Sequence, residues 1–274
     1  MTLKSILVHV DQSHTKHPVE AAAYLAEKFD AHVSGLATEE QLYIPAYVTT
    51  GVPREILQIS RQHQKTRLQE AEAVFKDVMS LAGRLDQTSW ESLIDEAPDA
   101  LARRARVNDL VVISQKQPED QGRYSDSDTE DIVTTAEGGV LVVPHIGFDD
   151  TIGTSILLAW NDSNESARAV KAAMPILEAA KQVEVLIVAK GGEDDFTGSE
   201  VSRYLSEHGI EVTLNIAASG SIGVSDIILN EATEKGHDLV VMGAYSHTRL
   251  REAILGGTTK DIFRHMTVPV LFGS

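Results

Sequence analysis

Short apolar runs alternate with longer amphipathic segments along the chain. Residues 155–160 form a nearly continuous apolar run, which is typical of a strand in a parallel sheet covered on both faces. Val170, Ala173, Met174 and Leu177 then recur at the i, i+3, i+4, i+7 spacing of a helix that buries one stripe. The alternation predicts an α/β fold with a doubly wound, mostly parallel sheet.

The same alternation continues to the C-terminus. It predicts strands at 183–189, 210–216, 238–242 and 268–272, and helices at 200–207, at 226–234 and from about 258. Asp162 is expected to cap the helix after 155–160, with Glu165 as its capping-box partner. Pro175 falls inside that helix and is expected to kink it.

The N-terminal part of the chain has the same plan with a longer middle. An irregular stretch at 41–53 precedes a long helix that is predicted to end near Leu81. One face of that helix carries Leu68, Ala71, Phe75 and Val78. Strands are predicted at 88–93 and 109–114, and Pro98 suits the first helical position between them.

Three sequence matches in the same order indicate a duplicated unit. SILVHVD (5–11) matches SILLAWN (155–161), DLVVIS (109–114) matches DLVVMG (238–243), and GVLVVP (139–144) matches VPVLFG (268–273). We therefore predict two tandem domains, residues 1–146 and 153–274. A polar, Gly-containing linker is expected at 145–154.

Charge and composition exclude several classes of function. The 274 residues carry 41 Asp and Glu against 24 Lys and Arg, a net charge of −17, which disfavours nucleic-acid and anionic-membrane partners. The chain has no cysteine, so disulfides, thiolate metal sites and cysteine nucleophiles are excluded. No signal segment or membrane-spanning run is recognisable, which favours a cytoplasmic protein.

The loop after the strand at 238–242 is the most informative stretch. In an open parallel sheet, ligands bind outside the carboxyl ends of the strands at the switch point of the topology. Gly256 and Gly257 stand just before a predicted helix, where free amides and the helix dipole favour an anion. The alternative is an ordinary turn in which Thr258 caps the helix and Asp261 is its partner. The residues alone leave both interpretations open.

Local charge favours an anion there. Residues 243–274 hold Arg249, Arg251, Lys260 and Arg264 against only Glu252 and Asp261. This segment is therefore basic within an acidic protein.

Taken together, these features resemble a tandem universal stress protein. The nucleotide-binding signature of that family is Gly, two residues, Gly, nine residues, Gly, then Ser or Thr. Here the stretch has Gly243, Ser246 in place of the second Gly, Gly256, and Gly257 in place of the Ser or Thr, followed by Thr258 and Thr259. Asn161 stands where the family has an Asp that contacts the nucleotide sugar, and Trp160 beside it could stack on an adenine or block it.

The resemblance implies a fold, a ligand and a set of binding residues. The fold is two tandem, doubly wound, mostly parallel five-stranded sheets of the adenine nucleotide alpha-hydrolase-like, Rossmann-like kind. The ligand is ATP, with Mg²⁺, or another adenine nucleotide in the C-terminal domain. The predicted contacts are Asn161, Val188, Gly243, Ser246, Gly256, Gly257, Thr258 and Thr259.

The N-terminal copy departs further from the signature. Its loop at 114–131 has Gly122 as its one glycine and is rich in carboxylates, which would repel a triphosphate. Asp11, which matches the sugar-contacting Asp, is retained but also suits a helix cap. We interpret this copy as having lost nucleotide binding; the alternative is that the carboxylates of this loop, which outnumber Lys116 and Arg123, hold a cation.

Two other signals are given structural interpretations. Asp11, His14 and His17 lie near a helix start, where polar residues are ordinary, so a metal site is not favoured. The basic run at 103–106 falls late in a helix, where it complements the dipole rather than marking a nucleic-acid patch.

Three functions compete. The first is a stress-response regulatory protein whose C-terminal domain binds an adenine nucleotide. The second is an interaction scaffold of the same fold that binds no nucleotide. The third, a slow ATPase, ranks last because no general base is arranged in the sequence. The apolar last strands, 140–143 and 268–272, need cover, and the resemblance implies that they pair as an intramolecular pseudo-dimer, with a further homodimer left open.

Overall fold

The computed structural model describes residues 2–11, 16–40, 54–116, 126–136, 138–189, 197–218, 222–244 and 257–273. Its strands are β1 (Ser5–His9), β2 (His32–Glu39), β3 (Thr88–Ile94), β4 (Leu110–Ser114), β5 (Gly139–Val143), β6 (Ser155–Ala159), β7 (Gln182–Ala189), β8 (Val212–Ala218), β9 (Leu239–Gly243) and β10 (Val270–Gly273). Its helices are α1 (Lys16–Phe29), α2 (Arg54–Leu81), α3 (Ala97–Ala105), α4 (Asp126–Thr135), α5 (Asn164–Glu178), α6 (Thr197–Glu207), α7 (Val224–Glu234) and α8 (Gly257–His265), with a 3-10 turn at Leu85–Gln87. Strands and helices alternate, and the predicted α/β class is confirmed.

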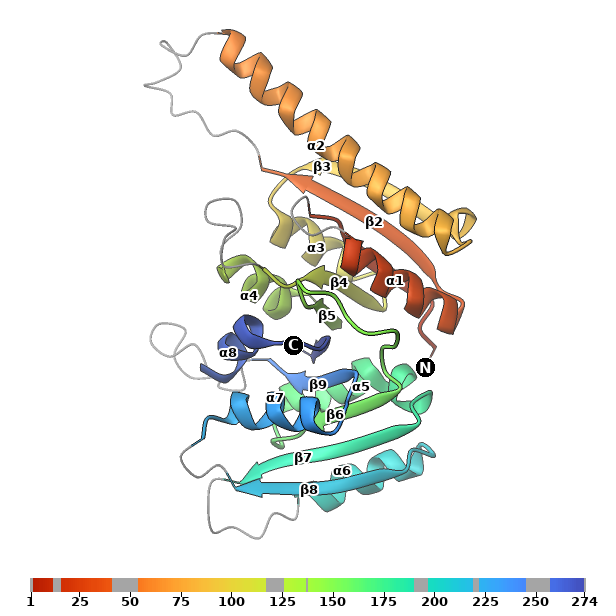
Figure 1. Ribbon diagram of the computed structural model, residues 1–274, viewed down its shortest axis with the longest axis vertical. Helices are drawn as coiled ribbons and strands as arrows, with labels where there is room; N and C mark the ends of the chain where they lie inside the picture. Colours follow the sequence, from red (N-terminus) through yellow and green to blue (C-terminus); the bar gives the residue numbers. More distant parts are fainter. Residues whose placement is uncertain are drawn as a thin grey trace.

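The strands form one ten-stranded sheet in the order β3-β2-β1-β4-β5-β10-β9-β6-β7-β8. Strands β1 to β5 occupy the upper part of Figure 1 and β6 to β10 the lower part. Within each group the order is the same, and the described pairings inside each group are parallel. The chain therefore contains two doubly wound five-stranded sheets joined edge to edge.

The joint is the antiparallel pair β5–β10. Val142 pairs with Val270 and Val140 pairs with Phe272, so the two strands are related by a pseudo-two-fold axis between them. All five residues of β5 and all four of β10 are buried. The two apolar edges predicted to need cover therefore cover each other, as in a pseudo-dimer within one chain.

Helices cover both faces of the sheet. The core on one face contains residues of α1, α2, α5 and α6, and the core on the other face contains residues of α3, α4, α7 and α8. Successive residues of a strand enter opposite cores, so Ile6 and Val8 pack on the first side while Leu7 packs on the second, each at most 2% exposed. This two-sided burial explains why the strands are continuous apolar runs.

The predicted helical stripes are also confirmed. Val170, Ala173, Met174 and Leu177 are buried in α5. In the longer α2, Ala71 and Phe75 are buried, and the Phe75 ring lies 5.2 Å from that of Trp90. Neither α2 nor any other helix in the described ranges is both long and apolar enough to cross a membrane.

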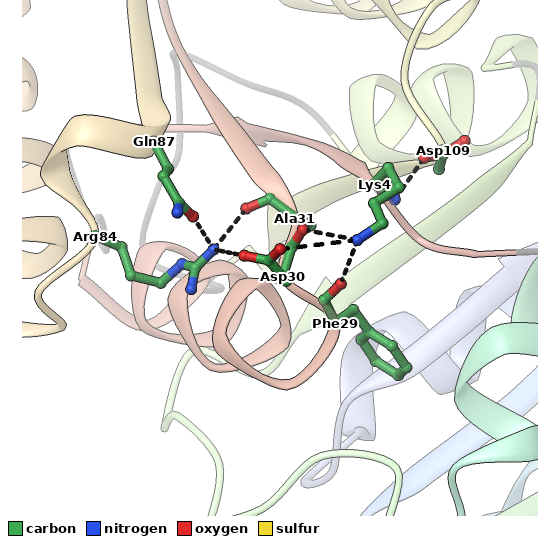
Figure 2. A network of polar contacts seen from close by, with 7 residues as sticks. All are labelled: Lys4, Phe29, Asp30, Ala31, Arg84, Gln87 and Asp109. Atoms are coloured by element: carbon green, nitrogen blue, oxygen red, sulfur yellow. Dashed lines mark hydrogen bonds and ion pairs between the residues drawn. The ribbon is translucent and has the colours of Figure 1, made fainter.

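The aspartate of the repeated DLVV motif has the same structural role in both halves. The Oδ2 atom of Asp109 accepts hydrogen bonds from the amides of Lys4 and Ser5, at 2.8 and 2.9 Å, one of which is drawn in Figure 2. In the second half, Oδ1 of Asp238 accepts one from the amide of Ser155 at 3.0 Å. Each carboxylate therefore satisfies backbone donors where the central strand of its half begins.

Figure 2 also shows the contacts that join the end of α1 to Lys4, before β1, and to Arg84, after α2. The Nζ of Lys4 donates to the carbonyls of Phe29 and Asp30, both at 3.2 Å. Arg84, just after α2, donates to the carbonyl of Ala31 at 3.2 Å and to a carboxylate oxygen of Asp30 at 3.3 Å. These contacts tie α1, β1 and the end of α2 together.

The segment at 145–154 is not a loose tether. Ile152 is fully buried, and the Nζ of Lys28 on α1 donates to the carbonyl of Gly153 at 3.0 Å. The hydroxyl of Thr151 donates to Asp238 at 2.6 Å. The predicted linker therefore packs against α1 and the start of β9.

Candidate functional site

The predicted binding residues fall at the ends of three neighbouring strands and at the start of one helix. Asn161 follows β6, Val188 is near the end of β7, and Gly243 ends β9. Because β6 lies between β7 and β9 and the strands are parallel, the sheet brings these three residues together at the carboxyl ends of the strands. Gly257, Thr258 and Thr259 form the first turn of α8. Ser246 and Gly256, like Arg249 and Arg251, lie at 245–256, outside the described residues.

Gly243 has a packing reason to be glycine. A Cβ atom at this position would lie 2.5 Å from the amide nitrogen of Ser166 and 2.6 Å from the carbonyl carbon of Glu165. Both are backbone atoms of the first turn of α5, so no side-chain movement could relieve the clash. The glycine that the signature assigns to the ligand is thus also required where α5 crosses the end of β9.

Asn161 takes part in capping α5. Its Oδ1 accepts hydrogen bonds from the hydroxyl of Ser163 at 2.7 Å and from the amide of Ser163 at 3.3 Å. The hydroxyl of Ser163 in turn accepts from the amide of Ser166 at 3.1 Å. The side chain of Asn161 is therefore held at the helix start, and it is exposed there.

The prediction that Asp162 and Glu165 form the capping box of α5 is wrong by one residue. The cap is Ser163, and the reciprocal partner is Ser166. Asp162 instead has a left-handed backbone with φ of 55°. An N-cap residue needs an extended backbone, which the left-handed turn at Asp162 excludes.

The first turn of α8 is where the sequence predicted an anion site. Gly257 is exposed, Thr258 is partly exposed and Thr259 is buried. The first amides of a helix have no partner within the helix, and the positive end of the dipole lies there. Because the helix begins at Gly257, Thr258 lies inside the first turn, and the interpretation of Thr258 as the helix cap is wrong.

Gly257 differs from Gly243 in what surrounds it. Among the described residues, the nearest atom to a Cβ built there is a carboxylate oxygen of Asp261 at 3.8 Å, an ordinary contact. Its φ does not lie in the left-handed range either. Neither packing nor backbone conformation within the described residues requires a glycine at 257.

The matching strand ends of the first half are filled differently. By strand register, His9 and Thr38 stand where Ala159 and Val188 stand in the second half. His9 is 5% exposed, and its Nε2 lies 3.0 Å from the hydroxyl of Thr38. Burial lowers the pKa of His9; Asp11 raises it by a smaller amount, and Lys116 lowers it further. Ala159 and Val188, by contrast, are both partly exposed.

Half of the first-half loop that was predicted to repel phosphate, residues 117–125 with Gly122 and Arg123, lies outside the described residues. The described part ends at Lys116 and resumes at α4. Asp11 is partly exposed after β1. The prediction that this copy lost its nucleotide site stays a prediction.

Side chains of the first half reach α8 across the joint. Gln115, 2% exposed and just after β4, donates from Nε2 to the carbonyl of Phe263 at 2.8 Å. Its Oε1 accepts from the amide of His145 at 3.0 Å. In addition, Glu130 on α4 lies 4.0 Å from the Nζ of Lys260 on α8. The helix that carries the candidate anion site is therefore braced by the other half.

The signals interpreted as structural have structural partners. The Nδ1 of His17 donates to the carbonyl of His145 at 3.1 Å, and His14 lies outside the described residues. No cluster of metal-ligating side chains occurs in the described ranges. In the basic run, Arg104 forms two hydrogen bonds with Glu91, at 2.6 and 2.7 Å, and Arg103 pairs with Asp95.

Sequence reasoning missed one buried ionic network in the second half. Glu184 on β7 is 2% exposed and accepts from the Nζ of Lys235 at 2.7 Å and from Asn215 at 2.8 Å. Burial opposes its ionisation, but these hydrogen bonds outweigh burial and hold its pKa below the ordinary value. His237, fully buried beside it with Nε2 at 3.6 Å from Glu184, has its pKa lowered by burial. A glutamate inside an apolar strand was the signal that could have found it.

Comparison with known proteins bears on the fold and on part of the sequence. The model of the universal stress protein family matches residues 221–272. A universal stress protein from Archaeoglobus fulgidus DSM 4304 aligns over 97% of this chain and 97% of its own, with a TM-score of 0.72 and 15% identity. A functionally unknown protein from Pseudomonas aeruginosa PAO1 aligns over 98% of this chain and 92% of its own, with a TM-score of 0.58 and 17% identity. The search of curated proteins gave no match.

These likenesses confirm the resemblance predicted from the sequence. The family match covers α7, β9, α8 and β10, and so includes Gly243 and the first turn of α8 but not the ends of β6 and β7. The structural match to the Archaeoglobus fulgidus protein extends over both halves. The chain therefore has the fold of the universal stress proteins twice, in tandem.

Proposed function

We propose that this chain is a stress-response regulatory protein whose second half, residues 153–274, binds ATP or another adenine nucleotide. The first half, residues 1–146, is a diverged partner domain without a nucleotide site of its own. Mg²⁺ accompanies the triphosphate, because the basic segment at 243–274 does not carry enough positive charge to neutralise a triphosphate. The cytoplasmic location predicted from the sequence stays a prediction.

The start of α8 carries the proposal. Gly257 is exposed at the first position of the helix, and the surrounding described residues give no packing reason for it. A residue without Cβ lets a phosphate approach the backbone at the start of the helix, and the Thr258 hydroxyl adds a donor there. Near the first turn the helix supplies one positive charge, from Lys260, beside the carboxylate of Asp261, whereas Arg264 lies in the last turn.

The difference between the two halves supports placing the nucleotide in the second. At matching positions the first half has a buried His9 hydrogen-bonded to the partly exposed, polar Thr38, whereas the second half has the apolar and partly exposed Ala159 and Val188. An adenine ring needs an apolar surface that solvent can reach before binding. Only the second of these two strand ends offers one.

The proposal is tested by titrating purified full-length protein with ATP, with and without Mg²⁺, in a calorimeter. The informative variant is Gly257→Glu. A carboxylate in the first turn favours the helix dipole, so α8 should keep its stability, while the same carboxylate repels phosphate. We expect saturable binding by the parent protein and a loss of at least about tenfold in affinity in Gly257→Glu, with an unchanged melting temperature.

Gly257→Ala is the matched control, because it adds a methyl group without charge. It should bind more weakly than the parent but more tightly than Gly257→Glu. Absence of any heat or melting shift at millimolar ATP in the parent protein would contradict the proposal. Equal affinity of the parent and Gly257→Glu would place the nucleotide elsewhere.

A second candidate function is an interaction scaffold that binds no nucleotide. Two observations favour it: packing against α5 explains Gly243, and capping of α5 engages Asn161. These signature positions can thus be retained for the fold alone. The same calorimetry separates the two candidates, since a scaffold gives no heat with ATP under any condition.

A further inference from the structure

Resting on the proposed function, we propose that Glu130 of the first half regulates the nucleotide site of the second by competing with the bound phosphates for Lys260. The two residues come from different halves of the chain and meet at the joint, with the carboxylate 4.0 Å from the ammonium group. Glu130 is only 7% exposed, so its charge is poorly screened by water. The pair therefore couples the two halves at the helix that bears the site.

Lys260 is placed to serve either partner. It is the fourth residue of α8, and side chains on a helix lean toward its N-terminus, where Gly257 lies. Its side chain is about one third exposed, at 34%, so it is not locked in place by packing. When phosphate is absent, the ammonium group of Lys260 pairs with Glu130. When phosphate binds at the first turn, the ammonium group can pair with the phosphate instead.

The position of α8 against the first half is fixed by another contact. Gln115, buried at the end of β4, donates to the carbonyl of Phe263 near the other end of α8. The equivalent residue of the second half, after β9, is Ala244, which has no side-chain donor to return the contact. The brace therefore runs in one direction, from the first half to the site-bearing helix.

Glu130 and Lys260 occupy equivalent positions in the two halves. Lys260 stands as far before Val270 as Glu130 stands before Val140, and these two valines occupy equivalent strand positions. In a pair of identical domains the same residue would meet its own copy there, and the two like charges would repel. Fusing two diverged copies into one chain allows an acid in one and a base in the other.

Competition and structural bracing predict opposite changes in nucleotide affinity when the carboxylate of Glu130 is removed. Removing the carboxylate should release Lys260 to the nucleotide and raise affinity, whereas a purely structural brace would lower affinity when broken. The gain should grow with the charge of the ligand, from AMP to ATP, and shrink in high salt.

The test measures ATP and AMP affinity by calorimetry on full-length Glu130→Gln, Lys260→Gln and the double variant. We expect Glu130→Gln to bind ATP about two- to fivefold more tightly than the parent, with a smaller gain for AMP. In the Lys260→Gln background the same change should have little effect. Glu130→Asp keeps the charge and should bind ATP with the affinity of the parent protein, unlike Glu130→Gln.

Glu91→Gln is the matched control, since it removes one negative charge from a carboxylate that pairs with Arg104 on α3 of the first half. If ATP binds the parent protein but Glu130→Gln changes affinity no more than Glu91→Gln, or weakens it, the competition is overturned and the proposed function stands. If no variant binds ATP, the proposed function fails and the competition fails with it. Melting temperatures of all variants identify any that lose the fold. If Glu130→Gln is one of them, Lys260→Gln carries the test: it should bind ATP more weakly than the parent, and an unchanged ATP affinity would overturn the competition.

Discussion

Glycines of similar appearance in the sequence have different causes. Gly243 and Gly273 both lie where a strand end meets the backbone of α5, and a Cβ at Gly273 would lie 2.1 Å from the amide nitrogen of Ala169. Packing alone therefore accounts for them. Gly257 is exposed and lacks such a neighbour among the described residues. At the scale of single residues, packing among the described residues explains Gly243 and Gly273 but not Gly257.

Two buried histidines make stability depend on pH. Burial lowers the pKa of both His9 and His237 below the ordinary value of 6.5. As pH falls below 6.5, the unfolded chain takes up these protons before the folded chain does, so the free energy of unfolding decreases. The stabilisation is fully present above about pH 7 and is lost progressively below 6.5.

Urea unfolding between pH 7.5 and 5.5 tests this. The parent protein should lose stability as pH falls, and His9→Gln should remove part of that loss, roughly 1 kcal/mol, because glutamine keeps a polar partner for Thr38 without titrating. His63→Gln, an exposed histidine on α2, is the control and should follow the parent. Identical pH profiles for the parent and His9→Gln would show that His9 does not contribute.

At the scale of elements, α5 connects the candidate site to both halves. Its N-terminus packs on the end of β9 at Gly243, and Ala172 further along lies against Gly139 of β5. The same helix is capped by Ser163, whose hydroxyl is held by Asn161. A change at the cap should therefore alter packing at the strand ends as well as the stability of the helix.

Replacement of the cap distinguishes it from its neighbour. Ser163→Ala should lower the free energy of unfolding by about 1 kcal/mol, because the amide of Ser166 loses its acceptor. Asp162→Gly should change it by less than about 0.5 kcal/mol or raise it, because glycine adopts the left-handed backbone without strain. Denaturant unfolding measures both. Greater loss in Asp162→Gly than in Ser163→Ala would restore Asp162 as the cap.

At the scale of the whole molecule, the joint between the halves is a core rather than a contact. β5 and β10 are buried throughout and lie in the middle of one continuous sheet. Helix α5 reaches β5, and Gln115 reaches α8, so both faces of the sheet are also bridged. Unfolding one half would expose the apolar edge strand of the other.

The two halves should therefore unfold together. Calorimetry should show a single transition whose van't Hoff and calorimetric enthalpies agree. Phe272→Ala, at the joint, and Phe75→Ala, under α2, should each destabilise by about 3–5 kcal/mol and shift that whole transition. A variant that splits the transition into two would show that the halves are independent folding units.

Much of the fold could be predicted from the sequence because its signals are local. Apolar runs bounded by turn residues predicted the strands, and the stripe at Val170 to Leu177 predicted the buried face of α5. The pattern predicted that the apolar last strand of each copy needs cover, and the family resemblance implied that the two strands pair, as β5 and β10 do. Cap positions were predicted less well, since Asp162 and Ser163 are both good capping residues and only the backbone angle separates them.

The sequence by itself determined the alternation of strands and helices, the duplication and the family resemblance, because each depends on the order of residues along the chain. Only the tertiary structure decided what the candidate residues contact. It gave Gly243 and Asn161 structural partners on α5, filled the first-half strand ends with His9 and Thr38, and set Glu130 beside Lys260. The reason is physical: periodicity reports which face of an element is buried, whereas a contact between residues far apart in the sequence depends on how the elements pack.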